Sequence, residues 1–182
     1  MFLKGDSMPK IIENVRERAI AEAREVLTRD GYAAMTVRRV AKDLDIAPAT
    51  LYNYFPSKEH LAACVMLEDW RELTRVIEER SSGLSAEDTV RALFDTVRRF
   101  TEKYALSWSQ YGTEASATPM RKRYHSVLVE QLAGYIRAAM TPEESGSGPW
   151  RPLFLAELVL RFGSDGVSVY EDLEPAVKKI LD

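Results

Sequence analysis

Apolar side chains recur at three- and four-residue steps along almost the whole sequence, which is the period of one face of an α-helix. Residues 9–30 show this most clearly, and strand-like alternation is not seen in any segment. The members of that first apolar face are Ile12, Val15, Ala19, Ala23 and Val26. We therefore expect an all-α protein.

Residues that end and start helices divide this pattern. Gly31 follows the first helix as a left-handed stop, and Thr36 can cap a short second helix. Ser57 and Ser85 can cap two longer helices, since each hydroxyl precedes a run of helix-forming residues. The long helix after Ser57 contains no Gly or Pro before Gly83, so it should be continuous and stiff.

Residues 36–61 read TVRRVAKDLDIAPATLYNYFPSKEHL and predict two short helices in succession. The turn between them spans residues 45–47, and Pro48 then occupies the first position of the second helix, where its missing N–H is no handicap. That helix ends before Pro56. Two helices so joined form a helix-turn-helix, whose second helix lies in the major groove of DNA.

The second short helix has an inner and an outer face. Leu51 and Phe55 are four positions apart, so they share one side and can pack inward. The outward residues are Ala49, Thr50, Tyr52, Asn53 and Tyr54, with Lys58 at the start of the next helix. Small residues allow close approach, an amide can pair with an adenine edge, and hydroxyl and ammonium groups reach phosphates. The alternative is a surface helix that carries tyrosines without a partner.

Net charge contributes little to DNA attraction. The chain carries 25 Lys/Arg and 28 Asp/Glu, a net charge of −3. Residues 1–60 hold ten basic and nine acidic residues, and the remainder holds 15 and 19, so the two parts carry +1 and −4. DNA contact must therefore come from a few placed groups.

The stretch resembles the DNA-binding signature of the TetR family of transcriptional regulators. The similarity lies in the leading threonine, the Thr-Leu-Tyr and Tyr-Phe pairs, and the Ser-Lys-Glu-x-Leu helix start. It marks as DNA-binding residues Thr36, Arg38, Ala47, Pro48, Ala49, Thr50, Tyr52, Asn53, Tyr54 and Lys58. The resemblance implies a three-helix DNA-binding domain, residues 1–56, and a helical ligand-binding and dimerisation domain, residues 57–182. It also implies a cytoplasmic regulator, usually a repressor, which binds a palindromic operator as a homodimer and is released by a small-molecule inducer.

Two residues depart from the family pattern. Asp45 stands where the turn often has Gly, and Asp tolerates left-handed backbone better than most residues. Ala47 stands where the recognition helix often has a Ser or Thr cap, and its side chain cannot accept the N–H bond. We expect the turn to survive and the helix start to lose about 1 kcal/mol.

Two apolar helices near the C-terminus, expected at residues 120–140 and 153–169, suit the dimer interface that the resemblance implies. The segment LFLAELVLRF, residues 153–162, has too little polar surface for a half-exposed helix. The alternative is a central helix buried within one monomer. Gly163 and Gly166 either allow close helix approach or break the helix.

Aromatic residues of the body are candidates for an inducer pocket, because aromatic-lined cavities between helices suit apolar ligands. The candidates are Trp70, Tyr104, Trp108, Tyr111 and Tyr124, with Gln110, Glu114 or His125 as polar groups that could orient a ligand. For any one of these aromatics the alternative is a place in the protein's own core.

Catalysis, cofactors and metals find no support in the sequence. The two histidines, His60 and His125, are not part of any known nucleophile motif with Cys64, and no Cys/His set has metal-ligand spacing. No apolar run reaches the roughly 20 residues of a membrane span. The remaining alternative to a ligand-controlled regulator is a helical adaptor, which would leave Tyr52 and Tyr54 unexplained.

Overall fold

The computed structural model describes residues 14–80, 83–107, 117–146 and 148–182, with side chains from residue 125 on in the third of these segments. Every regular element in these segments is helical, as expected, and none is a strand. The helices are α1 (Val15–Arg29), α2 (Val37–Asp43), α3 (Pro48–Tyr54), α4 (Lys58–Arg80), α5 (Ala86–Lys103), α7 (Ala117–Ala139), α8 (Pro142–Gly146), α9 (Arg151–Gly163) and α10 (Tyr170–Leu181).

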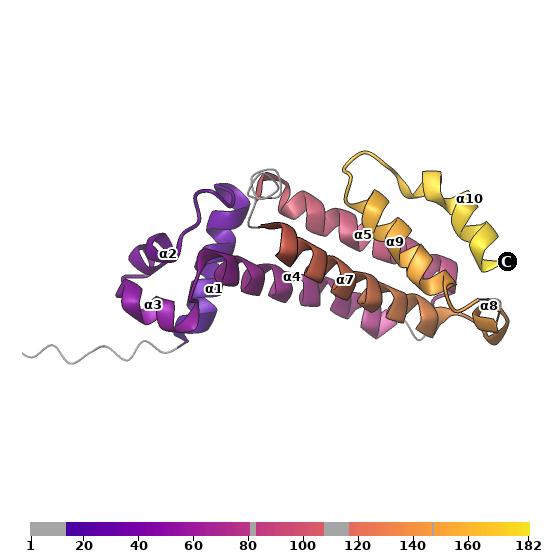
Figure 1. The fold of residues 1–182 in the computed structure, drawn as a ribbon, viewed down its shortest axis with the longest axis horizontal. Coiled ribbons are helices and arrows are strands. Elements are labelled where there is room, and N and C mark those ends of the chain that lie inside the picture. The colour runs from indigo at the N-terminus through magenta and orange to yellow at the C-terminus, as the bar shows by residue number, and fades with distance from the viewer. Residues whose placement is uncertain (1–13, 81–82, 108–116, 147) are drawn as a thin grey trace, which may run out of the picture.

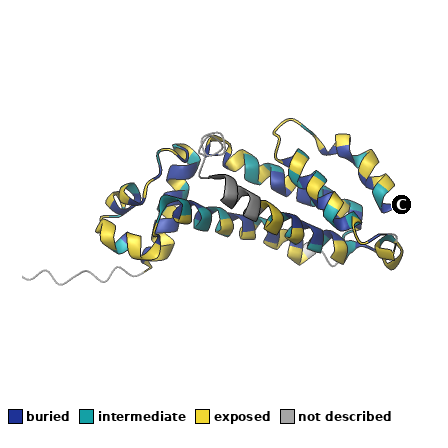
Figure 2. Ribbon diagram, in the orientation of Figure 1, coloured by how far each residue is buried: buried dark blue, intermediate teal, exposed yellow. Residues whose placement is uncertain are grey.

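The molecule is elongated, with α1, α2 and α3 at one end and α5, α7, α9 and α10 at the other (Figure 1). Helix α4 runs from the first group into the second. Apart from α8, which has no buried residue, the helices turn a buried side toward their neighbours and an exposed side outward (Figure 2). This one-sided burial is what the three- and four-residue spacing predicts.

Two hydrophobic cores meet along α4. The N-terminal core takes Leu61, Ala62 and Val65 from the first turns of α4. The body core takes Trp70 and Ile77 from its later turns. One uninterrupted helix is therefore packed into both cores, so the two ends of the molecule share a single stiff element.

The expected helix ends are confirmed. Gly31 has φ +82°, the left-handed value of a helix stop. The hydroxyl of Thr36 accepts a hydrogen bond from the N–H of Arg39 at 3.0 Å. Ser57 accepts one from the N–H of His60 at 3.2 Å. Ser85 caps α5 in the same way, so each cap satisfies a backbone donor at a helix start.

The helix expected at residues 153–169 is wrong at its end: α9 stops at Gly163. A Cβ at Gly163 would lie 3.0 Å from Val97 Cγ1, tighter than most Cβ contacts, so α9 approaches α5 closely at this glycine. Gly166 then adopts φ +77°, which turns the chain away. Asp165 holds the turn, because its carboxylate accepts hydrogen bonds from the N–H groups of Val167 and Ser168, both at 2.9 Å.

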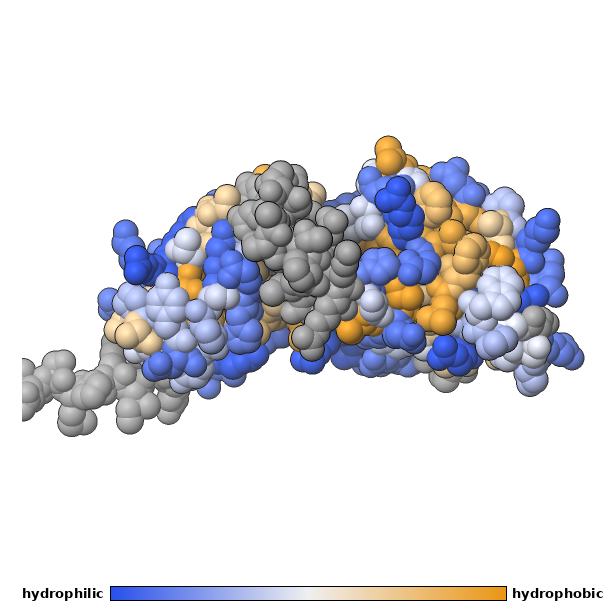
Figure 3. All heavy atoms as spheres, viewed as in Figure 1, coloured by the Kyte–Doolittle hydropathy of each residue, from blue (hydrophilic) through white to orange (hydrophobic). Residues whose placement is uncertain are grey.

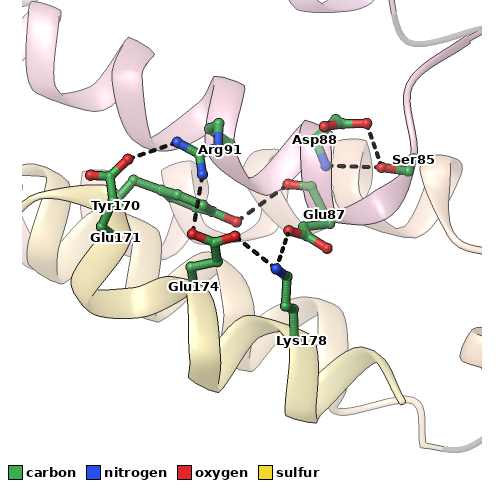
Figure 4. Close-up of polar contacts among 8 residues, drawn as sticks. All are labelled: Ser85, Glu87, Asp88, Arg91, Tyr170, Glu171, Glu174 and Lys178. Carbon is green, nitrogen blue, oxygen red and sulfur yellow. Dashed lines mark hydrogen bonds and ion pairs between the residues drawn. The ribbon is translucent and has the colours of Figure 1, made fainter.

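Helix α10 is fastened to α5 by charged and aromatic contacts (Figure 4). Arg91 donates to Glu171 at 2.9 Å and to Glu174 at 3.3 Å. Its guanidinium lies 4.1 Å from the ring centre of Tyr170. Lys178 adds an ion pair to Glu87 of α5 at 3.6 Å. Arg91 thus holds α10 over the body by pairing with two of its carboxylates.

Candidate nucleic-acid interface

The turn between α2 and α3 closes with two backbone hydrogen bonds. The N–H of Ile46 donates to the carbonyl of Ala41 at 2.8 Å, and the N–H of Asp45 donates to that of Lys42 at 3.1 Å. This pair is a Schellman motif, with Asp45 as its left-handed residue at φ +56°. The expectation that Asp45 would take the left-handed place usual for glycine is confirmed.

Helix α3 is anchored from inside by two side chains. Leu51 is fully buried and Phe55 is 1% exposed, as their spacing predicts. Pro48 stands in the first turn, and Ala47 precedes it with no side-chain hydrogen bond to the helix start. The orientation of α3 therefore depends on apolar packing and on the turn, because a capping contact is missing.

The opposite face of α3 is open to solvent. Tyr52 and Tyr54 are 39% and 46% exposed. Four more predicted DNA-binding residues, Ala47, Pro48, Ala49 and Asn53, are exposed, and Thr50 is half-buried. Two phenol rings, an amide and a methyl-bearing surface are thus gathered on one short helix.

The predicted residues of α2 are placed differently from one another. Thr36 is exposed but its hydroxyl is engaged in the helix cap. Arg38 is exposed and has no ion pair within the described segments. Its neighbour Arg39 instead bonds Asp30 at 2.5 Å, and hydrogen bonds from Arg29 and Arg39 lower the pKa of Asp30 to about 2. Arg39 therefore fixes α2 to the end of α1, and Arg38 is the arginine available to a partner.

Lys58, at the start of α4, is held by an aromatic ring that sequence reasoning missed. Its Nζ lies 3.9 Å from the ring centre of Tyr32, which is fully buried. A cation over a ring face is attracted by the ring's quadrupole. Tyr32 directly follows Gly31, which ends the first helix, and the sequence gives no other indication that its ring meets Lys58. The ammonium is thus positioned beside the N-terminus of α4, which itself favours anions.

The predicted pocket residues are only partly within the described structure. Trp70 is 3% exposed, and its Nε1 donates to Gln131 Oε1 at 2.8 Å. Tyr104 is fully buried in the N-terminal core. The ring of Phe100 lies between the rings of Tyr104 and Trp70, with its centre 5.2 Å and 5.3 Å from theirs. His125 is exposed and lies 3.3 Å from Glu157. Trp108, Gln110, Tyr111, Glu114 and the side chain of Tyr124 lie outside the described residues.

A charged junction beside these aromatics was also missed. Asp69 of α4 is 7% exposed and accepts hydrogen bonds from Arg24 Nε and the hydroxyl of Tyr104, each at 2.6 Å, and forms an ion pair with Lys103. Ser107 donates to the carbonyl of Leu27 at 2.9 Å. These contacts tie α1, α4 and α5 together where the two cores meet. Asp69 alone gave no sequence signal, because its partners come from distant segments.

Neither a metal centre nor a membrane span is found in the part of the chain that the structure describes. No group of three or more His, Cys, Asp or Glu residues there could hold a metal ion. None of the helices there is long and apolar enough to cross a bilayer.

Two short helices, joined by a closed turn and presented at one end of a helical body, define a helix-turn-helix protein. The family model described as bacterial regulatory proteins, tetR family, matches residues 19–65. This N-terminal region is thus similar to the tetR family of bacterial regulatory proteins, as its sequence resemblance predicted.

Curated relatives match the same region. The regulator UidR of Escherichia coli is 29% identical over 79 residues, which cover 43% of this chain and 40% of that protein. The repressor KstR of Rhodococcus jostii is 33% identical over 72 residues, 39% of this chain and 34% of that protein. The chain thus aligns with less than half the length of the curated relatives it matches.

Solved structures extend the likeness of the fold over nearly the whole chain. Salmonella enterica GusR has a TM-score of 0.63 at 20% identity and covers 94% of this chain and 96% of its own. A transcriptional regulator from Cytophaga hutchinsonii has a TM-score of 0.58 at 23% identity, covering 91% and 94%. At these identities the likeness establishes the fold, including the arrangement of the helical body.

Proposed function

We propose that this protein is a ligand-responsive transcriptional regulator, a repressor, which binds a palindromic operator in cytoplasmic DNA as a homodimer. The observation that carries the proposal is the exposed face of α3. Leu51 and Phe55 hold the helix from within, while Tyr52, Asn53 and Tyr54 face outward. The match of residues 19–65 to the tetR family model and the relatives named as transcriptional regulators support it.

The outward side chains fall into two classes by chemistry. Asn53 can form a bidentate pair with an adenine edge, and the Ala49 and Thr50 surface suits a thymine methyl group. Tyr54, Arg38 and Lys58 suit phosphate oxygens, which carry no sequence information. We assign recognition of base pairs to the first class and placement on the duplex to the second.

A homodimer would place two copies of α3 on successive turns of one face of DNA, about 34–36 Å apart. The surface proposed for pairing is the apolar face of α7 and α9. Val127 is 57% exposed, Trp150 54% and Phe154 47%. Hydrophobic residues gather over the body in the view of Figure 3. Exposed apolar area of this kind is a liability in a monomer and suits an interface.

Ligand control is proposed to run through the body, residues 57–182, and to reach the DNA-binding part, residues 1–56, along α4. Trp70 lies in the body core, and the first turns of the same helix lie in the N-terminal core. A ligand that displaces Trp70 would tilt a stiff helix. A tilt of α4 would change the spacing of the two recognition helices.

The test is a gel-shift assay with the intergenic DNA upstream of the protein's own gene. Lys58→Ala should weaken binding equally on all sequences and lower the slope of log affinity against log salt by about one unit. Asn53→Ala should relax the preference for one base pair by roughly 1–3 kcal/mol and leave the salt slope unchanged.

Lys179→Ala, the loss of an exposed lysine on α10 at the other end of the molecule, is the matched control and should retain both properties. An adaptor without DNA binding would give no shifted band with any variant. If Lys58→Ala left both affinity and salt slope unchanged, the proposed orientation of α3 and α4 on DNA would be wrong.

A further inference from the structure

Arg91 and Arg98 lie seven residues apart on one face of α5, and they differ in the hydrogen-bond acceptors that surround them. Arg91 has its carboxylates, Glu171 and Glu174, and lies on the ring of Tyr170. The guanidinium of Arg98 lies 5.3 Å from the ring centre of Phe94. Its Nε and Nη2 atoms are buried and have no hydrogen-bond acceptor within the described segments. Arg91 therefore has carboxylate partners, whereas two donor atoms of Arg98 have no acceptor within the described segments.

The two unsatisfied atoms are not an arbitrary pair. Nε–H and the outer hydrogen of Nη2 point the same way from one edge of the planar guanidinium. That edge is the one that binds both oxygens of a carboxylate side by side. Leaving charged donors buried without acceptors is costly, so an acceptor of matching shape should be bound strongly.

An acidic residue on which the charge of Arg98 acts is already hydrogen-bonded elsewhere. Asp165, in the turn after α9, accepts hydrogen bonds from the hydroxyl of Ser168 at 2.5 Å and from two backbone N–H groups. These bonds lower the pKa of Asp165 to about 2, with Ser168 the largest cause and the charge of Arg98 only a minor one. Asp165 therefore organises its own turn instead of pairing with Arg98.

The surroundings of Arg98 define the rest of the ligand. Phe94 and Val97 lie next to it on α5 and belong to the buried body core. Gly163 brings the end of α9 against Val97 and against the carbonyl of Phe94. Arg98 itself is half-buried, so the edge lies just beneath the surface. A charged edge next to apolar side chains suits an anion carried on an apolar body.

We infer that the buried edge of Arg98 is the recognition point for a small organic carboxylate, bound between α5 and the turn after α9. The carboxylate oxygens would accept hydrogen bonds from Nε and Nη2. The inference deepens the proposed ligand control and rests on it for any effect on DNA. Binding itself is independent of DNA.

Thermal unfolding of the full chain without DNA tests the inference, with benzoate as probe and benzamide as its neutral match, at constant ionic strength. Benzoate should raise the unfolding midpoint with increasing concentration, since it binds only the folded state. Benzamide should not raise it. Arg98→Met should weaken benzoate binding by about tenfold or more, which is the loss of a charge-assisted pair. Arg91→Met, the matched control, should keep the benzoate effect.

Several results would overturn the inference. Equal shifts with benzoate and benzamide would show that charge is not recognised, and stabilisation by inorganic phosphate instead of benzoate would show another ligand class. Retained benzoate binding in Arg98→Met would place the site elsewhere. Energetic coupling between Arg98→Met and Asp165→Asn in a double-mutant cycle would show that Asp165 is the true acceptor.

A second readout does not depend on the Met variant folding. The Nε–H proton of Arg98, assigned by its absence in Arg98→Lys, should shift in the NMR spectrum on titration with benzoate and stay in place with benzamide. A resonance unmoved by benzoate would overturn the inference. If benzoate binds but leaves operator affinity unchanged, the carboxylate site stands and its proposed role in ligand control fails.

Discussion

Replacing Asp69 with Asn should destabilise the junction between the two cores. The carboxylate is 7% exposed and has three donors, Arg24, Lys103 and Tyr104, from two other helices. Burial raises the pKa of Asp69, but the hydrogen bonds from Lys103, Tyr104 and Arg24 together outweigh burial and lower it. The ionised form is thus the one that the folded protein stabilises.

The size of the effect follows from the exposure of the partners. Breaking a buried ion pair costs about 3–5 kcal/mol when the remaining charge cannot reach water. Here Arg24 and Lys103 are 31% and 42% exposed, so both can be rehydrated after the substitution. Asn also keeps one acceptor for the buried hydroxyl of Tyr104. We therefore expect Asp69→Asn to lower the free energy of unfolding by about 2–3 kcal/mol at neutral pH.

The pH dependence has a definite sign. A carboxyl group whose folded pKa is lowered contributes stability above its unfolded pKa, about 3.9, and loses that contribution as pH falls through the folded value. The difference between wild type and Asp69→Asn should therefore be constant from about pH 7 to pH 5 and shrink below about pH 4. Urea unfolding at fixed protomer concentration measures it, with Glu72→Gln, an exposed carboxylate of the same helix, as control. A cost below about 1 kcal/mol, or a difference independent of pH, would refute the reasoning.

Three further changes have clear expectations. Asp45→Gly should raise the free energy of unfolding by about 0.5–1 kcal/mol, because φ +56° is strained for a residue with a Cβ; a loss in urea unfolding would contradict this. Phe154→Asp, at an exposed site of α9, should give a folded monomer by light scattering with no gel-shift band, and tight operator binding by that monomer would refute the dimer proposal. Inserting Gly-Gly after Leu67, between the two cores, should keep DNA binding but remove its response to inducer in fluorescence anisotropy, and a normal response would exclude α4 as the route.

The helices of the N-terminal part could be predicted from the sequence because local interactions determine them. The caps at Thr36 and Ser57, the stop at Gly31 and the inward pair Leu51 and Phe55 each depend on residues within a few positions of one another. Propensity, capping and spacing act over the same range, so they agree with the structure. The left-handed Asp45 could be predicted for the same reason, since a closed Schellman turn requires one residue with positive φ.

The body was less readable because its decisive contacts join distant segments. At Gly163, its last residue, α9 lies against Val97 of α5, which is 66 positions earlier in the sequence. An apolar segment alone does not reveal how near a neighbouring helix will pass, so glycine could be interpreted as a close contact or as a break. Asp69 and Tyr32 were missed for the same reason: each has partners that only the fold brings near.

Arg91 and Arg98 of α5 show what the structure adds to the sequence. In the sequence both are basic residues on one helix, and neither position indicates a function. Arg91 reaches two carboxylates because α10 lies over its part of α5 (Figure 4). Arg98 lies seven residues further along α5, about two helical turns, and its charge acts on Asp165 in the turn after α9. The carboxylate of Asp165 is already hydrogen-bonded to Ser168. Because α10 begins only at Tyr170, it covers Arg91 and leaves Arg98 to bind a partner.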